Sequence, residues 1–308
     1  MSVSQAAATK NTAAVIGLGS MGFGMALSLK RAGFTVLGAD VSAEAVARFV
    51  AEGGRGIDTL KAEIGAADVV VSVVVNAAQT ETVLFGENGI ADAMRPGTVF
   101  ISSATMDPAI ARALSARLEA KGVHYLDAPI SGGAARAAKG ELTIMASGTD
   151  AAFAAARPAL DAMATKVYEL GAEAGFGTAF KMINQLLAGV HIAAACEAIA
   201  FAAKQGLDLT KVYEVITASA GNSWMFENRI PHVLAGDYTP LSAVDIFVKD
   251  LGIIQDMARA ERYPVPLSAA ALQVYLAASG SGMGRDDDSS LARLYAQLSG
   301  ARLPEKAN

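Results

Sequence analysis

The chain has 308 residues, of which 53% are hydrophobic and 18% charged, and its formal net charge is -5. This composition allows a large buried core and argues against a disordered or fibrous protein. No basic run is present, so we expect no nucleic-acid partner; the single cysteine, Cys196, excludes a disulfide framework, and three widely separated histidines predict no metal site.

The first half of the chain alternates between apolar, strand-like segments and helical ones. Strand-like segments lie at 12–17, 35–40, 68–75, 97–103, 124–131, 142–148 and 166–171. Ser42 is placed to cap the helix that follows the second of them. Strands that are apolar on both faces and separated by helices predict a parallel sheet covered on both sides. We therefore expect a Rossmann-like, doubly wound α/β domain over residues 1–173.

From residue 174 the strand pattern stops and helical periodicity takes over. We expect helices over 178–204, 210–220, 223–235, 242–262, 267–280 and 289–300. Thr178, Thr210 and Ser242 are candidate helix caps, and the polar stretch 280–290 is expected to be a mobile loop. Residues 174–308 are thus predicted to form an all-α domain, joined to the first domain by the long helix at its start.

That long helix is apolar enough to raise the question of a membrane span. It contains Asn184, Gln185, His191 and Glu197, which are costly in lipid, so we expect a buried interdomain helix and no membrane partner. His191 and Glu197 are expected to be core residues whose polar groups are satisfied. The N-terminus lacks an apolar segment behind a basic start, which predicts no signal peptide, and we expect a cytoplasmic location.

A glycine-rich turn, GLGSMG, follows the first predicted strand and precedes a helix. In this G-x-G-x-x-G pattern the first glycine allows a tight turn, the second a close approach to a pyrophosphate, and the third helix–strand packing. Asp40, at the end of the second strand, can accept hydrogen bonds from both adenosine ribose hydroxyls and would repel a 2′-phosphate. We therefore expect NAD as the cofactor, bound by Gly17, Leu18, Gly19, Ser20, Met21 and Gly22 together with Asp40.

Three further stretches place polar residues where sheet and helix meet. DAPISGG (127–133) ends a strand with Ser131, Gly132 and Gly133, whose bare N–H groups beside a hydroxyl suit a small carboxylate. GFGTAFKMIN places Lys181 and Asn184 three residues apart, on one helical surface. FVKD sets Lys249 beside Asp250 in another helix. Taken singly, each stretch has a simpler explanation. DAPISGG also fits an ordinary loop, Lys181 a surface lysine, and the Lys249–Asp250 pair a solvated ion pair.

Four motifs in order, GLGSMGFGMA, DAPISGGAARAAKGELTIMASG, GFGTAFKMINQ and FVKDLGI, resemble those of the β-hydroxyacid dehydrogenases over nearly the whole chain. This family includes 3-hydroxyisobutyrate dehydrogenase and tartronate semialdehyde reductase. The resemblance implies that Lys181 is the catalytic lysine, that Asn184 orients the substrate, and that the Ser131–Gly132–Gly133 loop holds the substrate carboxylate. It also implies cofactor contacts at Val74, Val75, Thr105 and Lys249.

Lysine is a suitable residue for the reaction that this family carries out. Oxidising an alcohol requires removal of a hydride and of the hydroxyl proton, and a lysine among apolar helices and other cations can act as the base. In the reverse direction its ammonium group would protonate or stabilise the oxyanion. One stretch, SSATMDP, departs from the family at Ala104, where a serine is common, so the side-chain hydrogen bond of that position is not expected.

Two stretches of the second half, NSWMFENRIPHVLAGDYTPLSAVDIFVKDLG and NQLLAGVHIAAACEA, resemble the branch of the family that oxidises L-threonate. The implied substrate is a four-carbon hydroxy acid, oxidised next to its carboxylate to a 2-oxo acid. Candidates to meet its distal hydroxyls, which equally fit ordinary helix ends and solvated surface, are Asn222, Ser223, Asn228 and Asp245.

Other functions stay open at this point. Tartronate semialdehyde or 3-hydroxyisobutyrate could be the substrate of the same machinery. Imine reductases resemble this architecture but usually replace the lysine, so Lys181 argues against them. A non-catalytic regulator that senses NAD is an alternative from a different class. The apolar composition of the helical half, with the family resemblance, also predicts a homo-oligomer.

Overall fold

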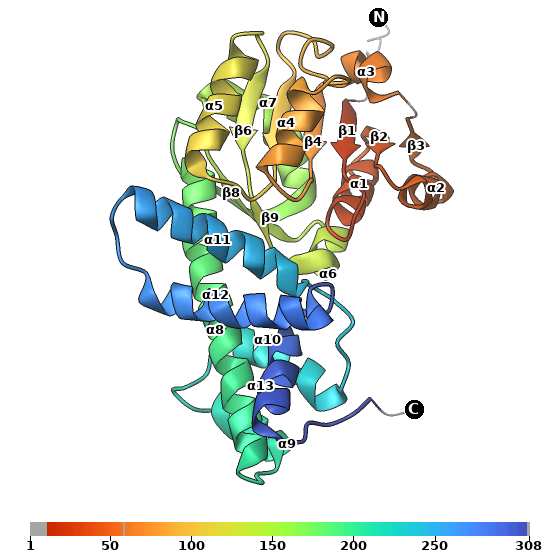
Figure 1. Ribbon diagram of the computed structural model, residues 1–308. Helices are drawn as coiled ribbons and strands as arrows, with labels where there is room; N and C mark the ends of the chain where they lie inside the picture. Colours follow the sequence, from red (N-terminus) through yellow and green to blue (C-terminus); the bar gives the residue numbers. More distant parts are fainter. Residues whose placement is uncertain (1–10, 58, 307–308) are drawn as a thin grey trace, which may run out of the picture. The chain divides into compact units, whose positions relative to one another are not determined.

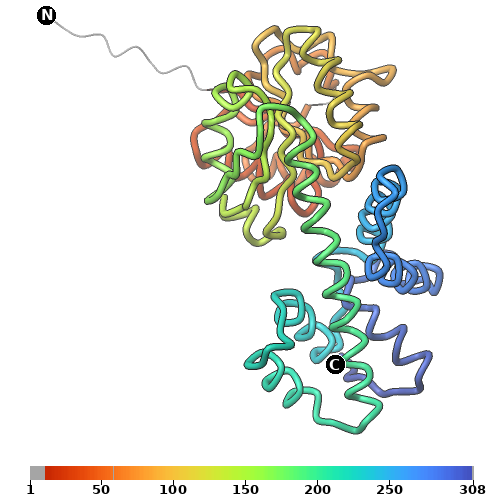
Figure 2. Tube along the Cα trace, turned by 90° about the vertical axis from the view of Figure 1, so that its left-hand side faces the viewer, coloured from red at the N-terminus to blue at the C-terminus, as the bar shows by residue number. Residues whose placement is uncertain are grey.

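The computed structural model describes residues 11–57 and 59–306 and divides the chain into two compact units, Met1–Lys181 and Met182–Asn308. The chain passes from the first unit to the second along the helix α8, Phe176–Lys204 (Figure 1 and, in green, Figure 2). Residues 1–10, on which the prediction of no signal peptide depends, lie outside the described part, as do residues 58, 307 and 308.

The first unit is built on a six-stranded parallel sheet with the order β3-β2-β1-β4-β5-β6. Its strands are β1 Thr12–Ile16, β2 Thr35–Ala39, β3 Arg55–Gly56, β4 Val69–Ser72, β5 Val99–Ser102 and β6 His124–Asp127. The helices are α1 Gly22–Arg31, α2 Ala43–Ala51, α3 Leu60–Glu63, α4 Ala77–Phe85, α5 Pro108–Glu119, α6 Gly133–Lys139 and α7 Asp150–Met163, with a 3₁₀ turn η1 at Ile64–Ala66. The chain winds outward from β1 in both directions, so the predicted doubly wound fold is confirmed (Figure 1).

The strands form because successive apolar side chains can be buried on both faces of the sheet. Val69 and Val71 of β4 belong to a core that also contains Met25 of α1 and Leu160 of α7. The residue between them, Val70, belongs to a second core, which also contains side chains of α4 and α5. Two hydrophobic cores, one on each face, explain why the strand segments read as continuous apolar runs rather than as alternating ones.

A second, three-stranded sheet was not predicted. It has the order β7-β8-β9, with β7 Ile130–Ser131, β8 Leu142–Ala146 and β9 Ala164–Glu169, and its β7 and β8 run antiparallel. The apolar segments at 142–148 and 166–171 are therefore strands, as expected, but they lie outside the main sheet. An apolar run indicates burial and does not reveal which strand is its neighbour, so sequence periodicity could not separate the two sheets.

The second unit is helical, as predicted. It contains α9 Leu209–Thr217, α10 Trp224–Ala235, α11 Val244–Ala260, α12 Pro266–Ala278, a π-helical turn η2 at Ser279–Met283, a 3₁₀ turn η3 at Asp288–Ser290, and α13 Leu291–Ser299. Together with most of α8 these elements form the helical part of the chain, drawn from green to blue in Figure 2. They enclose one core, in which Ile192 and Cys196 of α8 pack with Leu251 and Tyr275. The Phe247 and Tyr275 rings stack there at a centroid distance of 5.2 Å.

Helix caps were predicted less well than helices. Ser42 caps α2 as expected, by accepting a hydrogen bond from the Ala45 amide. Helix α9 is capped by Asp208, whose carboxylate accepts from the Thr210 amide at 2.9 Å, so Thr210 is not a cap. Ser242 precedes the cap position of α11. Thr178 is not a cap either, because it lies in the first turn of α8, where its amide and that of Gly175 donate to the Asp127 carboxylate.

The stretch 280–290 forms helical turns whose last four residues are buried, and its prediction as a mobile loop is wrong. Asp287, Asp288, Ser289 and Ser290 are all fully buried. Asp288 forms a two-point ion pair with Arg229, with N–O distances of 2.6 and 3.1 Å, and Asp287 accepts from the Leu241 amide at 2.9 Å. Polar composition predicted a loop because these partners lie far away in the sequence.

Helix α8 is long and apolar enough to cross a membrane by length and composition, and half of its most apolar window is buried inside the protein. Its apolar character is accounted for in part by the second core. The prediction that His191 and Glu197 are core residues is wrong, because both are exposed; Glu197 accepts a hydrogen bond from the Tyr295 hydroxyl at 3.1 Å. Because α8 has many apolar residues on both its buried and its exposed face, composition alone did not show which face contains His191 and Glu197.

Candidate active site

The glycine loop joins β1 to α1 at the carboxyl edge of the main sheet. Gly17 has a φ of +93°, and a Cβ there would lie 2.8 Å from the Val73 carbonyl oxygen; a Cβ at Gly22 would lie 1.8 Å from the Gly17 oxygen. These two glycines are therefore required by the fold itself. A Cβ at Gly19 would meet nothing within 4 Å. The space beside Gly19 is open, as the close approach of a pyrophosphate requires.

The start of α1 is suited to bind an anion. Residue Met21, in the cap position, provides no side-chain hydrogen bond to the helix, and the first turn contains no acidic residue. The first amides of a helix lack partners within the helix and carry partial positive charge, which favours phosphate. The loop and the helix together therefore fit the phosphates of a dinucleotide.

Asp40 lies directly after β2 and is tied to the loop. Its Oδ2 atom accepts a hydrogen bond from the Leu18 amide at 2.6 Å, and its Oδ1 atom accepts from the Ser42 amide at 2.8 Å. Each carboxylate oxygen can accept a further bond, so Asp40 can hold the loop and a ribose at once. Sequence reasoning missed Arg48 of α2, whose guanidinium lies 3.5 Å from the Leu18 carbonyl and 4.3 Å from the Phe23 ring centroid.

The other predicted cofactor residues of the first unit follow β4 and β5, at the same edge of the sheet. Val74 packs against the core and Val75 is 47% exposed. Thr105 is partly buried, and its neighbour Ala104 is only 1% exposed. The side chains at the ends of adjacent parallel strands share one edge, where open α/β sheets bind their ligands.

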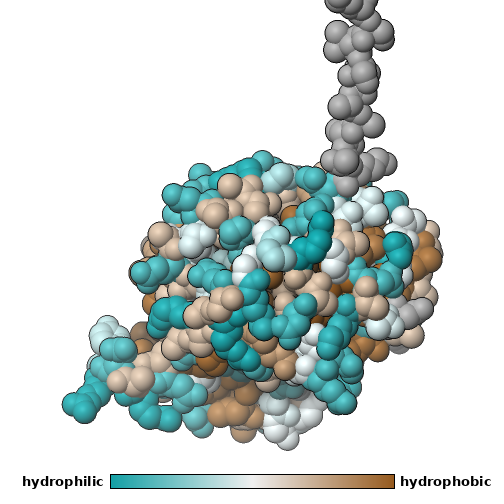
Figure 3. Space-filling view, turned by 90° about the horizontal axis from the view of Figure 1, so that it is seen from above, coloured by the Kyte–Doolittle hydropathy of each residue, from teal (hydrophilic) through white to brown (hydrophobic). Residues whose placement is uncertain are grey.

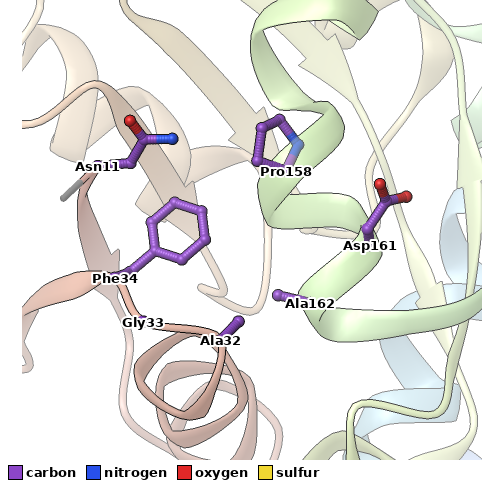
Figure 4. A pocket seen from close by; sticks show the side chains of 7 residues that line it. All are labelled: Asn11, Ala32, Gly33, Phe34, Pro158, Asp161 and Ala162. Carbon is purple, nitrogen blue, oxygen red and sulfur yellow. The ribbon is translucent and has the colours of Figure 1, made fainter. Parts of the chain in front are cut away.

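A hollow of about 360 Å³ lies at the opposite edge of this unit and is a different site. Asn11, Gly33 and Phe34, which precede β1 and β2, line one side of it, and Pro158, Asp161 and Ala162 of α7 line the other (Figure 4). Since the glycine loop follows β1, the hollow is not part of the expected cofactor site.

The loop expected to bind a carboxylate follows β6. Ser131 ends β7 and is partly buried, while Gly132 and Gly133 have φ values of +135° and +76°. A Cβ at Gly133 would meet no atom within 4 Å, so its backbone is open to a ligand. These positive φ values favour glycine at both positions.

Lys181 belongs to the same unit as these loops and is only 9% exposed. It lies in the second turn of α8. The first turn of α8 is fixed to the end of β6, because the Thr178 hydroxyl donates to Asp127 Oδ1 at 2.6 Å. The helix that carries the candidate lysine is thus bonded to Asp127, the last residue of β6, and the carboxylate loop follows the same strand.

Asn184 and Lys249 belong to the second unit, where a hydrogen-bonded chain joins them. Asn184 donates to Gln185 at 3.0 Å, Gln185 donates to Asp250 at 2.5 Å, and Lys249 donates to the other Asp250 oxygen at 2.5 Å. Asp250 is 1% exposed. The sequence identified both ends of this chain but missed Gln185 and Asp250, which link them.

The four candidates for distal hydroxyls all have hydrogen-bond partners within the second unit. Ser223 caps α10, and Asn222 donates to Glu227 at 2.5 Å. Asp245 accepts from the Ser279 hydroxyl at 2.6 Å, and Asn228 accepts from Arg229. These contacts fit the alternative that the sequence left open, in which the four residues belong to ordinary helix ends and solvated surface. Within residues 11–57 and 59–306, no group of three or more His, Cys, Asp or Glu is arranged to hold a metal ion.

Comparisons with known proteins agree with this geometry. A family model described as the NAD binding domain of 6-phosphogluconate dehydrogenase matches residues 12–171, and one described as NAD-binding of NADP-dependent 3-hydroxyisobutyrate dehydrogenase matches residues 175–295. The first unit is therefore an NAD-binding domain.

Relatives match over almost the whole chain. L-threonate dehydrogenase of Cupriavidus necator is 56% identical, over 95% of this chain and 98% of its own, and that of Escherichia coli K12 is 50% identical over 94% and 95%. A crystal structure of 3-hydroxyisobutyrate dehydrogenase from Salmonella typhimurium is 49% identical, with a TM-score of 0.88 over 92% of this chain and 100% of that one. The chain therefore belongs to the β-hydroxyacid dehydrogenases of the 3-hydroxyisobutyrate dehydrogenase type, in the branch of the L-threonate dehydrogenases.

Proposed function

We propose that this protein oxidises L-threonate with NAD to the 2-oxo acid 2-dehydro-L-erythronate. The carbon next to the carboxylate loses a hydride and its hydroxyl loses a proton. The observation that carries the proposal is the 56% identity to an L-threonate dehydrogenase over 95% of the chain. An NAD-binding unit that also contains a buried lysine and an open carboxylate loop supports it.

The residues of the first unit fit NAD. The backbone amides of the Gly17–Gly22 loop and the start of α1 would hold the pyrophosphate, and Asp40 would accept hydrogen bonds from the adenosine ribose. Val74, Val75 and Thr105 follow strands at the same edge and would line the cofactor. When bound, the cofactor supplies the acceptor for the hydride.

The protein's own groups then bind the acid and move its proton. Ser131, Gly132 and Gly133 would hold the substrate carboxylate through a hydroxyl and backbone amides. A neutral amine at Lys181 accepts the hydroxyl proton, and the ammonium returns it in the reverse direction. Asn184 would orient the substrate, and Lys249, fixed by Asp250, would add positive charge near the reacting groups.

The proposal is tested with purified protein, NAD and a panel of acids, by following the absorbance of the reduced cofactor. We expect turnover with L-threonate and much slower turnover with 3-hydroxyisobutyrate and glycerate. We expect Lys181→Ala to lower kcat by about 10²–10⁴-fold with little change in NAD affinity, because proton transfer contributes that range. An active Lys181→Ala variant would contradict the role of the lysine, and inert L-threonate would contradict the substrate.

A second candidate substrate has a specific observation in its favour. The Salmonella structure that is 49% identical to this chain is named as a 3-hydroxyisobutyrate dehydrogenase. The same machinery would act on 3-hydroxyisobutyrate or tartronate semialdehyde if the distal part of the site accepted them. A non-catalytic NAD sensor, the alternative from another class, would keep NAD binding and show no turnover with any acid of the panel.

We infer in addition that the protein is a homo-oligomer in the cytoplasm. Exposed residues recur along α8 at spacings of three or four, and most are large and apolar; they are Phe176, Phe180, Ile183, Leu187, His191, Ala194, Ala198 and Phe201, here called the α8 stripe. This spacing is that of helices that pack side by side. On the face seen in Figure 3, by contrast, hydrophilic and hydrophobic residues are intermingled.

The boundary between the functional domains after residue 173 stays a prediction.

A further inference from the structure

We propose that Asp127 is a positioning residue for the reaction: its carboxylate caps the N-terminus of α8 and thereby fixes where Lys181 stands. The inference rests on the proposed role of Lys181 as the acid–base group. All residues that it uses belong to the first unit.

Helix α8 begins without a capping side chain of its own. The Gly175 carbonyl accepts the first helical hydrogen bond, from the Ala179 amide at 2.9 Å, so Gly175 occupies the cap position and has no side chain to offer. The amides of the first turn would be left without acceptors in a buried place, which is costly. Their acceptors come from strands far away in the sequence.

Asp127, at the end of β6, supplies most of these acceptors. Its Oδ2 atom accepts from the Gly175 amide at 2.9 Å and from the Thr178 amide at 2.8 Å, and its Oδ1 atom accepts from the Thr178 hydroxyl at 2.6 Å. The Ser147 hydroxyl accepts from the Gly177 amide at 2.9 Å and lies 3.4 Å from the same carboxylate. A negative group at a helix N-terminus is favourable, and this one is 1% exposed. Burial raises the pKa of Asp127, and the hydrogen bonds that its carboxylate accepts from Thr178, Gly175 and Ser147 oppose that rise by favouring the ionised form.

The position of the first turn is also fixed sterically. A Cβ at Gly177 would lie 2.4 Å from the Met145 carbonyl oxygen and 2.8 Å from that of Asp127, so the turn lies directly on the backbone of β6 and β8. Gly175 has a φ of +100°, and a Cβ there would lie 2.9 Å from the Pro108 oxygen. The start of the helix therefore has one well-defined position, and Lys181 follows Thr178 by three residues, less than one turn.

The same residue also precedes the carboxylate loop. Asp127 pairs with Ser147 through two backbone hydrogen bonds of 3.0 and 2.8 Å, and the chain reaches Ser131 four residues later. One side chain thus connects the strand end that leads to the carboxylate loop with the helix that carries the lysine. A shift of about 1 Å between reacting groups can cost about 100-fold in rate, so loss of this connection should slow catalysis.

The test compares Asp127→Ala and Asp127→Asn with the matched core variant Leu118→Ala, which lies in the core on the α4–α5 side of the main sheet. We expect Asp127→Ala to lower kcat about 10–100-fold, with NAD affinity within threefold of wild type. Asp127→Asn should recover much of the loss, because an amide oxygen can still accept backbone N–H bonds. Leu118→Ala should lower the thermal unfolding midpoint while leaving kcat close to wild type.

Equal kcat values for Asp127→Ala and Leu118→Ala, at temperatures where both are folded, would overturn the inference. If Asp127→Ala does not fold, Thr178→Val decides, since it removes only the 2.6 Å hydroxyl bond; a wild-type kcat in that variant would also overturn it. Lys181→Ala separates this inference from the proposed function. An active Lys181→Ala enzyme defeats the proposed function, whereas an inactive one beside a fully active Asp127→Ala defeats only the present inference.

Discussion

Asp40 has two tasks in the proposed function, and two substitutions separate them. The carboxylate accepts hydrogen bonds from the Leu18 and Ser42 amides, and its charge would exclude a 2′-phosphate. We expect Asp40→Asn to keep one acceptor for the loop but lose the charge, so that the ratio of kcat/KM for NADP to that for NAD rises about tenfold or more, equivalent to about 1.4 kcal/mol. Asp40→Ala should in addition raise the KM for NAD, because the glycine loop loses the acceptor for the Leu18 amide.

Steady-state kinetics with each cofactor measures these ratios. Asp161→Asn is a matched control, since Asp161 is an exposed aspartate at the opposite edge of the same unit. An unchanged cofactor ratio in Asp40→Asn would show that its charge does not set the preference.

The residues missed by sequence reasoning are those whose partners lie far away in the chain. Asp250 was visible in FVKD, but a neighbouring lysine suggests a solvated ion pair, and only the fold buries the carboxylate and brings it to Gln185. Asp127 stood in a motif that was interpreted for its serine and glycines. Its role depends on Thr178, 51 positions later. Motifs identify groups that contact ligands more readily than groups that hold those contacts in place.

At the level of elements, the sequence predicted segments better than their ends and neighbours. Strands and helices form from apolar runs and periodicity, which are local properties, and β4 and α8 were found in this way. The second sheet was missed because strand pairing is not local. The cap of α8 was missed because its capping carboxylate comes from β6 rather than from the residues just before the helix.

The η3 turn provides a pH-dependent measure of the second core. Burial raises the pKa of Asp288 to about 6, from its usual 3.8, although Arg229 opposes the change. The folded state then holds a proton on this carboxyl at pH values where the unfolded chain has lost it. This group's contribution to stability is therefore largest below about pH 4 and falls as the pH rises to about 6.

We expect the stability of the wild type relative to Asp288→Asn to fall by roughly 2–3 kcal/mol between about pH 4 and pH 6.5, and to change little above that. This difference is measured by denaturant unfolding at several pH values. The unfolding is followed by the fluorescence of Trp224, which is the single tryptophan and belongs to the second unit. A constant difference over the whole range would mean that Asp288 stays ionised beside Arg229.

For the whole molecule, the order of an NAD-binding unit followed by a helical unit could be predicted because the hydrophobic period changes once, near residue 174. The compact units divide at Lys181 and Met182, inside a single helix. The candidate site residues are distributed over both units. Within α8, Lys181 belongs to the first unit and Asn184 to the second. Lys181 and Asn184 are three residues apart in the sequence of that helix.

The α8 stripe predicts how copies of the chain associate. Its large members are exposed, with Ile183 at 61% and Leu187 at 49%, and apolar residues repeating with the spacing of packed helices favour association with a second copy. We expect the wild type to be an oligomer by light scattering and Leu187→Glu to dissociate it, since a charge buried in such an interface without a partner costs several kcal/mol.

The matched control is Leu298→Glu on α13, where the leucine is 75% exposed and outside the stripe. Leu298→Glu should keep the wild-type mass. Unchanged mass in Leu187→Glu would place the interface elsewhere, and a monomeric wild type would contradict the prediction of a homo-oligomer.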